Sequence, residues 1–275
     1  MINLDSAREE TIRGANGMNI FVRSWQPKTR ARAVVAICHG VKSHSGYYGW
    51  AAAHLNAKGF AVYALDLHGR GKSDGDRYYL NEFRDYLDDL EALIQLAKSR
   101  EPDLPIFLLG HSAGGVVSSV YTLERQSLLA GFICESFAFQ VYAPEFALAV
   151  LKGLSHVAPH AHVLFLKNKD FSRDPGAVQI MDDDPLIAHE AQPTRTVAQL
   201  VSADERLKRE FGLITLPVLI LHGTADKVTK PSGSQLFFDN AGSTDKTLKL
   251  YEGHVHDLLN DLGKESVMAD HSRPN

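Results

Sequence analysis

Short runs of apolar residues, each followed by a glycine-containing loop and a stretch of helical periodicity, constrain the fold of this chain most. After Pro27 these runs are Ala33–Cys38, Ala61–Leu65, Pro105–Leu109, Ala130–Cys134, Pro217–Leu221 and Thr247–Tyr251. Continuously apolar strands are typical of a parallel sheet that is covered on both faces. Helical stretches fit between them at Tyr48–Lys58, Phe83–Lys98, Ala113–Glu124 and Ser232–Asn240. The sequence therefore predicts an alternating α/β chain with a mostly parallel central sheet and helices on both faces.

Two regions depart from this alternation. Near the N-terminus, Glu9–Arg13 and Met18–Trp25 are β-like segments around Asn16-Gly17, which predicts an antiparallel hairpin. Between about Ser136 and Gly212 no clear strand is predicted, and the alternation resumes at Pro217. We therefore interpret residues 136–212 as a helical lid inserted into one core, formed by residues 1–135 and 213–275. The aromatic residues of the insertion are Phe137, Phe139, Tyr142, Phe146, Phe165 and Phe171.

Charge and composition exclude several classes of protein. The formal net charge is −4 and the 29 basic residues are scattered, which argues against nucleic-acid binding. Charges interrupt every apolar stretch before the roughly 20 residues that a membrane span needs. The segment from Met1 to Glu10 lacks the pattern of a secretory signal. Cys38 and Cys134 each end an apolar run, so we expect buried thiols, no disulfide framework and a cytoplasmic location.

The pattern G-x-S-x-G occurs at Gly110–Gly114, between the apolar run Pro105–Leu109 and a helical stretch. A strand that turns abruptly into a helix strains the residue between them and exposes its side chain at the top of the sheet. The N-terminus of the helix offers unpaired N–H groups to a developing oxyanion. The pattern also arises by chance in a chain with 21 glycines, but this placement favours Ser112 as a nucleophile.

A serine hydroxyl requires a base and a carboxylate that orients the base, and the chain order Ser, acid, His suits this kind of sheet. Asp226 lies just after the buried run Pro217–Leu221, so it is the predicted acid. His254 and His256 both follow the run Thr247–Tyr251 and both are candidates for the base. Local sequence favours His256 only weakly.

Loops after two other runs complete the predicted site. His39-Gly40-Val41 follows the first long run, which predicts that the backbone N–H groups of Val41 and Ala113 form an oxyanion hole. A simple strand-ending turn is the alternative. The glycine-rich loop Asp66–Ser73 lacks the spacing of a phosphate-binding loop, so we interpret it as a structural turn beside the site.

These motifs together resemble the monoacylglycerol lipase and lysophospholipase group of α/β-hydrolases, of the serine aminopeptidase S33 type. The resemblance extends from about Trp25 to Asn260 and rests on His39-Gly40 with His44 and Tyr47-Tyr48, Asp66–Ser73, Gly110–Gly115, Ser172–Pro175 with Asp184–Leu186, His222–Asp226 and Tyr251–Gly253. It implies the α/β-hydrolase fold. Aligned on Tyr251–Gly253, the family's catalytic histidine falls on His256. The same alignment implies Ser112 as nucleophile, Asp226 as acid, and Val41 and Ala113 at the oxyanion hole.

The chain departs from the family pattern at several positions. Ser43 stands where the family usually has glutamate, and Ala113 where methionine is common, so the acyl preference stays open. The chain stops at His271–Asn275 without the apolar helix that usually closes the fold. Either that helix is shortened or a partner protects the core, which leaves a homodimer open.

The resulting hypothesis is a serine esterase that acts on a monoacylglycerol, lysophospholipid or similar small monoester through an acyl-enzyme. The apolar lid predicts an apolar acyl or aromatic group and leaves transient contact with a membrane surface open. No organic cofactor is required. No metal is expected either, because acidic or cysteine partners at ligand spacing are lacking for His156, His160 and His162. The alternatives are an acyltransferase or amidase with the same triad, and a non-catalytic ligand-binding relative.

Overall fold

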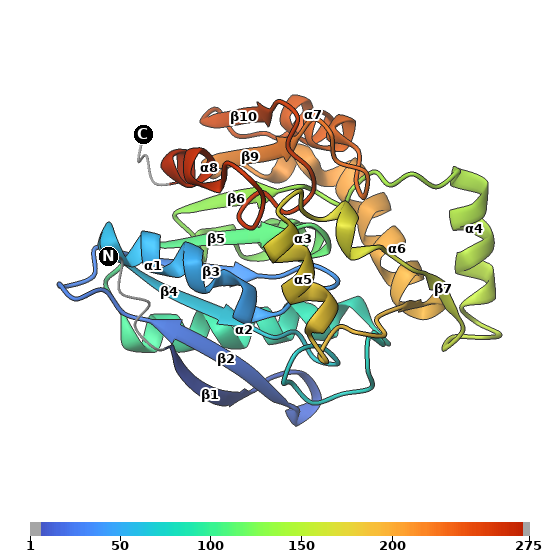
Figure 1. The fold of residues 1–275 in the computed structure, drawn as a ribbon, viewed down its shortest axis with the longest axis horizontal. Coiled ribbons are helices and arrows are strands. Elements are labelled where there is room, and N and C mark those ends of the chain that lie inside the picture. Colours follow the sequence, from blue (N-terminus) through green and yellow to red (C-terminus); the bar gives the residue numbers. More distant parts are fainter. Residues whose placement is uncertain (1–6, 272–275) are drawn as a thin grey trace.

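The computed structural model describes residues 7–271, which form one main sheet covered by helices (Figure 1). The expectation that no secretory signal begins the chain involves residues 1–6, which lie outside the described residues, as do residues 272–275. The strands of the main sheet are β1 (Arg8–Arg13), β2 (Asn19–Trp25), β3 (Ala33–Cys38), β4 (Phe60–Leu65), β5 (Ile106–His111), β6 (Gly131–Glu135), β9 (Val218–Gly223) and β10 (Lys246–Tyr251). The helices packed on it include α1 (Gly49–Ala57), α2 (Phe83–Arg100), α3 (Ala113–Arg125), α7 (Pro231–Asn240) and α8 (Lys264–His271).

Across the sheet the strands follow the order β1-β2-β4-β3-β5-β6-β9-β10. The first two strands are antiparallel, and β2 also runs antiparallel to β4. Every neighbouring pair from β4 to β10 is parallel. The structure therefore confirms the predicted mostly parallel sheet, and it confirms the predicted hairpin, whose turn is Ala15–Gly17.

The parallel strand β3 buries both of its faces. Its residues Val34 and Ala36 pack into one hydrophobic core, while Val35 and Ile37 pack into a second. Because successive side chains of a strand point to opposite sides, these two cores lie on opposite faces of the sheet. Residues of α2, α3 and α7 contribute to the first core, and residues of α1 and α8 contribute to the second.

The end of the described chain forms the short helix α8. Its side chains Val267 and Met268 are buried in the second core. A short helix therefore occupies the place where the sequence left open either a shortened helix or a covering partner.

The segment between β6 and β9 is mostly helical, as predicted, but it also contains two very short strands. Its main elements are α4 (Glu145–Leu154), β7 (His162–Leu164), α5 (Pro175–Asp183), β8 (Gln192–Pro193) and α6 (Thr194–Glu210). β7 and β8 pair as a small antiparallel sheet. Strands of two or three residues are too short to produce a recognisable alternation of apolar and polar residues, so the sequence did not predict them.

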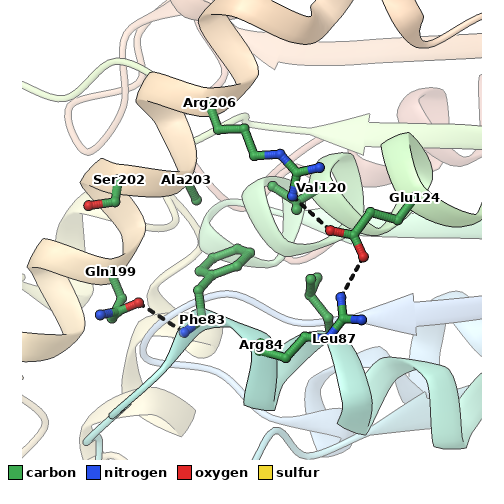
Figure 2. A pocket seen from close by; sticks show the side chains of 9 residues that line it. All are labelled: Phe83, Arg84, Leu87, Val120, Glu124, Gln199, Ser202, Ala203 and Arg206. Carbon is green, nitrogen blue, oxygen red and sulfur yellow. Dashed lines mark hydrogen bonds and ion pairs between the residues drawn. The ribbon is translucent and has the colours of Figure 1, made fainter.

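The two longest helices of this segment occupy different environments. α6 joins the first core through Ala203 and Leu207. Figure 2 shows the junction of α6 with α2 and α3, where Glu124 accepts hydrogen bonds from Arg84 at 2.5 Å and Arg206 at 2.7 Å. α4 lies on the outer side of α6, at the edge of the molecule (Figure 1). Among residues 7–271, none of the helices combines the length and the apolar character that a membrane span requires.

The aromatic residues of the segment also divide into buried and exposed groups. Phe137 and Phe139 stack on each other and pack against Phe211 in the first core. Phe146 and Phe165 are exposed. The aromatic composition of this segment therefore reflects both core packing and an apolar outer surface.

Candidate active site

Ser112 occupies the sharp turn between β5 and α3. Its backbone angles are φ 54° and ψ −121°, a region that non-glycine residues rarely adopt. The turn brings α3 so close to β3 that a Cβ atom at Gly114 would lie 2.2 Å from the carbonyl oxygen of Cys38. The glycine two positions after Ser112 is therefore a steric requirement of this turn, which agrees with the sequence interpretation.

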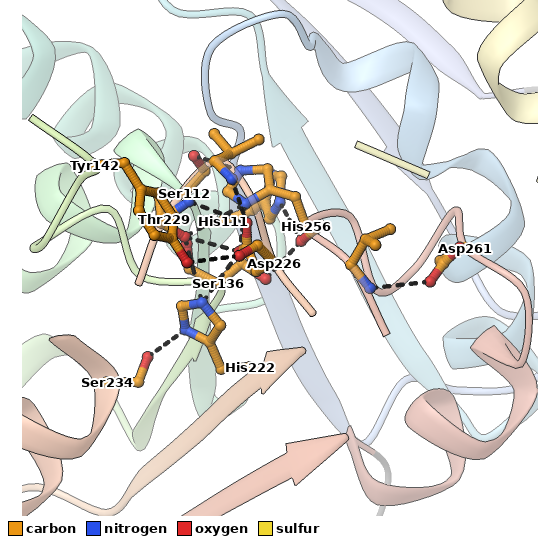
Figure 3. A network of polar contacts seen from close by, with 12 residues as sticks. His111, Ser112, Ser136, Tyr142, His222, Asp226, Thr229, Ser234, His256 and Asp261 are labelled. Atoms are coloured by element: carbon orange, nitrogen blue, oxygen red, sulfur yellow. Dashed lines mark hydrogen bonds and ion pairs between the residues drawn. The ribbon is translucent and has the colours of Figure 1, made fainter. Parts of the chain in front are cut away.

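The structure brings Ser112, His256 and Asp226 together, each in a loop after a different strand (Figure 3). The distance from His256 Nε2 to Ser112 Oγ is 2.9 Å, and that from His256 Nδ1 to Asp226 Oδ2 is 2.8 Å. A carboxylate can only accept a hydrogen bond, so Nδ1 carries the imidazole proton and Nε2 is free to accept the hydroxyl proton. The three side chains have the geometry of a nucleophile, a base and an orienting acid.

His254, the competing candidate, lies outside this arrangement. Its Nδ1 is 3.7 Å from Asp261 Oδ2, and burial together with the charge of Arg173 lowers its pKa. Two positions along the loop are enough to turn the two imidazoles toward different carboxylates.

The carboxylate of Asp226 is held by several donors besides His256. The backbone N–H groups of Val228 and Thr229 donate to its Oδ1 at 2.7 and 3.0 Å, and the Thr229 hydroxyl donates to its Oδ2 at 2.9 Å. His222 Nε2 lies 3.1 Å from the same Oδ2. Burial alone would raise the pKa of Asp226, but His256 and His222 lower it well below its usual value. Asp226 is therefore an ionised carboxylate suited to stabilising an imidazolium.

Sequence reasoning missed His222, although it directly follows the same apolar run that precedes Asp226. Its Nδ1 is 2.7 Å from the Ser234 hydroxyl of α7, which fixes the ring against the carboxylate. The sequence signal that could have identified it is a histidine four positions before the candidate acid, at the end of the same strand.

Three residues of the segment between β6 and β9 also contact the site. The Ser136 hydroxyl donates to the backbone oxygen of His256 at 2.5 Å, and the Tyr142 hydroxyl donates to that of Asp226 at 2.9 Å. The ring of Phe171 meets the His256 ring edge to face, with centroids 5.0 Å apart. The sequence did not predict these contacts, because each joins positions that are far apart in the chain.

The predicted oxyanion donors lie on either side of Ser112 in the fold. Ala113 is the first residue of α3, where backbone N–H groups have no partner within the helix. Val41 is on the loop after β3, which approaches so closely that a Cβ at Gly40 would lie 2.7 Å from Ser112 Cβ. Within the described part of the chain, neither N–H donates to a protein acceptor. Both groups are available for an oxyanion.

A second polar cluster includes Asp257, the residue that follows His256 in the same loop. Ligand-type atoms of His111, Glu135 and Asp257 lie within 4.8 Å of one another. Burial and the neighbouring Asp257 raise the pKa of Glu135 well above its usual value, which favours the neutral acid over the carboxylate. Burial lowers the pKa of His111 to about 3, which keeps the imidazole neutral. A protonated acid is a poor metal ligand, and we assign no metal to this cluster.

The two cysteines are buried in the core, as predicted. Burial raises the pKa of the Cys38 thiol to about 12 and that of Cys134 well above its usual value. Thiols of this kind are poor nucleophiles, so neither cysteine competes with Ser112 as a candidate nucleophile.

The Ser112 hydroxyl is closed off from solvent in this structure. Ser112 is 1% exposed and His256 is fully buried. A cavity of about 240 Å³ lies nearby, and its lining includes Lys42, Met181 and Asp257 but not Ser112. A substrate can therefore reach the hydroxyl only if part of the surrounding chain moves.

Known proteins share this architecture. A family model described as serine aminopeptidase S33 matches residues 29–263. The monoacylglycerol lipase of Mycolicibacterium smegmatis is 31% identical over 264 residues, which cover 95% of this chain and 94% of that protein. The monoglyceride lipase of Rattus norvegicus is 33% identical over 251 residues, covering 90% and 83%. The crystal structure of Paleococcus ferrophilus monoacylglycerol lipase matches with a TM-score of 0.81 and 31% identity, over 91% of this chain and 96% of that one.

Proposed function

This chain belongs to the serine aminopeptidase S33 family of α/β-hydrolases and is a carboxylic ester hydrolase, and we propose that Ser112, His256 and Asp226 are its catalytic triad. The observation that carries the proposal is the pair of contacts at His256, 2.9 Å to the serine hydroxyl and 2.8 Å to the carboxylate. The proposed substrate is a small or lipid-like monoester, such as a monoacylglycerol or a lysophospholipid.

The proposed reaction proceeds by two acyl transfers. His256 Nε2 accepts the proton of the Ser112 hydroxyl while Oγ attacks the ester carbonyl carbon, and Asp226 stabilises the imidazolium. The negative charge that develops on the carbonyl oxygen is bound by the N–H groups of Val41 and Ala113. The imidazolium then protonates the departing alcohol and leaves an acyl-serine. Water, deprotonated by His256, attacks the acyl group, and the imidazolium returns the proton to Ser112 Oγ as the carboxylic acid is released.

We further propose that residues 136–212 form a cap over this site, and that its outer part around α4 moves to admit substrate. The buried Ser112 supports this proposal, because the hydroxyl has no open path to solvent. The division of the segment supports it too, since α6 is packed into the core while α4 lies outside it.

The cap also carries an apolar surface suited to lipid. Phe146, Val150 and Leu154 recur at every fourth position of α4, with 74%, 65% and 39% of their surface exposed. Residues at this spacing share one face of a helix. We propose that this face contacts the lipid surface that presents the ester. The homodimer that the sequence left open stays a prediction, which light scattering would test.

The central experiment replaces Ser112 by alanine and uses Ser119→Ala as a matched control. Ser119 is a buried serine of α3 whose hydroxyl has no hydrogen-bond partner among the described residues. Ser112→Ala should abolish hydrolysis of p-nitrophenyl butyrate and of a monoacylglycerol, and it should abolish labelling by a fluorophosphonate probe. Ser119→Ala should retain both activities. Undiminished turnover by Ser112→Ala would disprove the assignment of the nucleophile.

Acceptor competition separates hydrolysis from the alternatives. In the presence of added alcohols or amines, a hydrolase releases mainly free acid, whereas an acyltransferase or amidase-type enzyme partitions toward the added nucleophile. A protein that binds ligand without catalysis would neither turn over ester nor label at Ser112.

A further inference from the structure

The loop that carries Val41 is fixed by bonds on both of the peptide groups that flank this residue. The carbonyl oxygen of Gly40 lies 2.6 Å from His39 Nδ1, and the backbone N–H of Leu67 donates to His39 Nε2 at 3.0 Å. Because the Leu67 N–H can only donate, Nε2 is the unprotonated nitrogen and Nδ1–H donates to Gly40. In a planar trans peptide the C=O and N–H point in opposite directions, so this bond restricts the direction of the Val41 N–H.

The following peptide group is held by a residue of the segment 136–212. The backbone N–H of Lys42 donates to Glu190 Oε1 at 2.9 Å, across 148 positions of sequence. Lys42 has a φ of 51°, in the left-handed region that lysine rarely adopts. A residue in such a conformation is strained and persists only where the surroundings hold it. The carboxylate of Glu190 supplies that restraint.

Glu190 is itself held by a buried charged network. Its Oε1 also accepts a hydrogen bond from Arg70 Nη1, and a second from Gln192 Nε2 at 2.7 Å. The Arg70 guanidinium donates in addition to Gln192 Oε1 at 2.7 Å and to the Tyr86 hydroxyl at 3.0 Å. The exposed surface is 5% for Glu190 and 2% for Arg70. A buried carboxylate with this many partners has little freedom to move.

We propose that Glu190 is a positioning residue for the oxyanion hole. It holds Lys42 in the left-handed conformation and thereby directs the Val41 N–H toward the carbonyl oxygen that Ser112 attacks. The inference rests on the proposed function, because it assigns Glu190 to the same reaction. It also makes catalysis depend on the cap: when residues around Glu190 move away from the core, the oxyanion donor loses its support.

The test must separate positioning from stability, because removing one member of a buried ion pair destabilises a protein strongly. Two double variants solve this problem. The amide variant combines Arg70→Met with Glu190→Gln, and the thioether variant combines Arg70→Met with Glu190→Met. Both lack the two buried charges and have side chains of similar length, but only the amide variant retains a side-chain oxygen that can accept the Lys42 N–H.

The readouts are kcat, KM, Tm and the inhibition constant of a trifluoromethyl ketone, whose adduct with serine places an oxyanion in the hole. We expect the thioether variant to have a kcat about tenfold below that of the amide variant, with KM and Tm nearly equal. Its affinity for the ketone should fall by a similar factor.

Equal kcat and equal ketone affinity in the two double variants would overturn the inference, as would losses that simply follow Tm across all the variants. The parent protein separates this failure from a failure of the proposed function. If the parent hydrolyses ester and Ser112→Ala does not, equality of the double variants rejects only the role of Glu190. If the parent has no activity, the proposed function and the role of Glu190 are rejected together.

Discussion

The carboxyl edge of the sheet and the segment 136–212 differ in how their residues are held in place. At the sheet edge, Ser112, Asp226 and His256 each follow a strand whose position is fixed by parallel pairing with its neighbours. In the segment, α4 lies outside the core and exposes apolar side chains such as Phe146 and Val150. On our proposal, the first region supplies the reactive groups and the second supplies a surface that moves to admit substrate.

The comparison also shows where the two regions meet. Ser136, Tyr142 and Phe171 contact the loops of the proposed triad, and Glu190 contacts the loop of the proposed oxyanion hole. The segment that we propose as a cover for the site therefore also contacts the loops that form it. Substitutions at α4 should alter access, whereas substitutions at these contact residues should alter the reaction itself.

The largest effect should come from the histidine loop at the sheet edge. His256→Ala removes the base of the proposed triad and should lower kcat on p-nitrophenyl butyrate by about a million-fold. His254→Ala, in the same loop, removes a side chain that contacts Asp261 and should leave kcat within about threefold of the parent value, because it lies outside the proposed triad. Steady-state kinetics of both variants provide the measurement. A comparable loss of kcat in His254→Ala would contradict the assignment of His256 alone as the base.

A smaller and more selective effect should follow from α4. Phe146→Ser with Val150→Ser removes apolar surface that is exposed in the structure. Loss of one or two such contacts with lipid should weaken activity on monoacylglycerol in vesicles or micelles by about tenfold. Hydrolysis of water-soluble p-nitrophenyl acetate should stay unchanged. Equal losses on the two substrates would mean that α4 supports the site rather than the approach of lipid.

The smallest effect concerns stability at the sheet edge. Burial and the neighbouring Asp257 raise the pKa of Glu135. At a pH above the usual pKa of glutamate, the folded state therefore keeps a proton that the unfolded state has released. The contribution of this group to the free energy of unfolding therefore falls as pH rises. Glu135→Gln cannot ionise, so its Tm relative to the parent should increase by about 2–4 °C between about pH 5 and pH 8.

Glu205→Gln on α6 is the control for that measurement, because the Glu205 side chain is 53% exposed in a surface ion pair with Lys152. Such pairs contribute little to stability, and its Tm profile should run parallel to that of the parent. If the Tm of Glu135→Gln also ran parallel to that of the parent across this pH range, the raised pKa of Glu135 would be contradicted.

Sequence predicted the sheet edge well because continuous apolar runs and a sharp turn are local signals. The predicted run Ala33–Cys38 coincides with β3. β5 extends to His111, two residues beyond the predicted end, because Gly110 and His111 still pair with β6 after the apolar run stops. The relative placement of Asp226 and His256 followed from strand order, and the resemblance to a family resolved the choice between His254 and His256.

The contacts of the segment 136–212 were beyond sequence reasoning for a physical reason. Phe137 and Phe146 are the same residue type in the same segment, yet one is fully buried and the other is 74% exposed. The bond from the backbone N–H of Lys42 to the Glu190 carboxylate joins groups that meet only after the chain has folded. Neither composition nor periodicity records such pairings.

The pairing of Arg70 with Glu190 constrains how genes of this family can be recombined. The two residues lie 120 positions apart, one in the core and one in the segment that we propose as the cap. A chimera that takes this segment from a relative without the carboxylate would leave a buried guanidinium uncompensated, at a cost of about 3–5 kcal/mol. Directed evolution of the cap should therefore treat position 70 as part of the library.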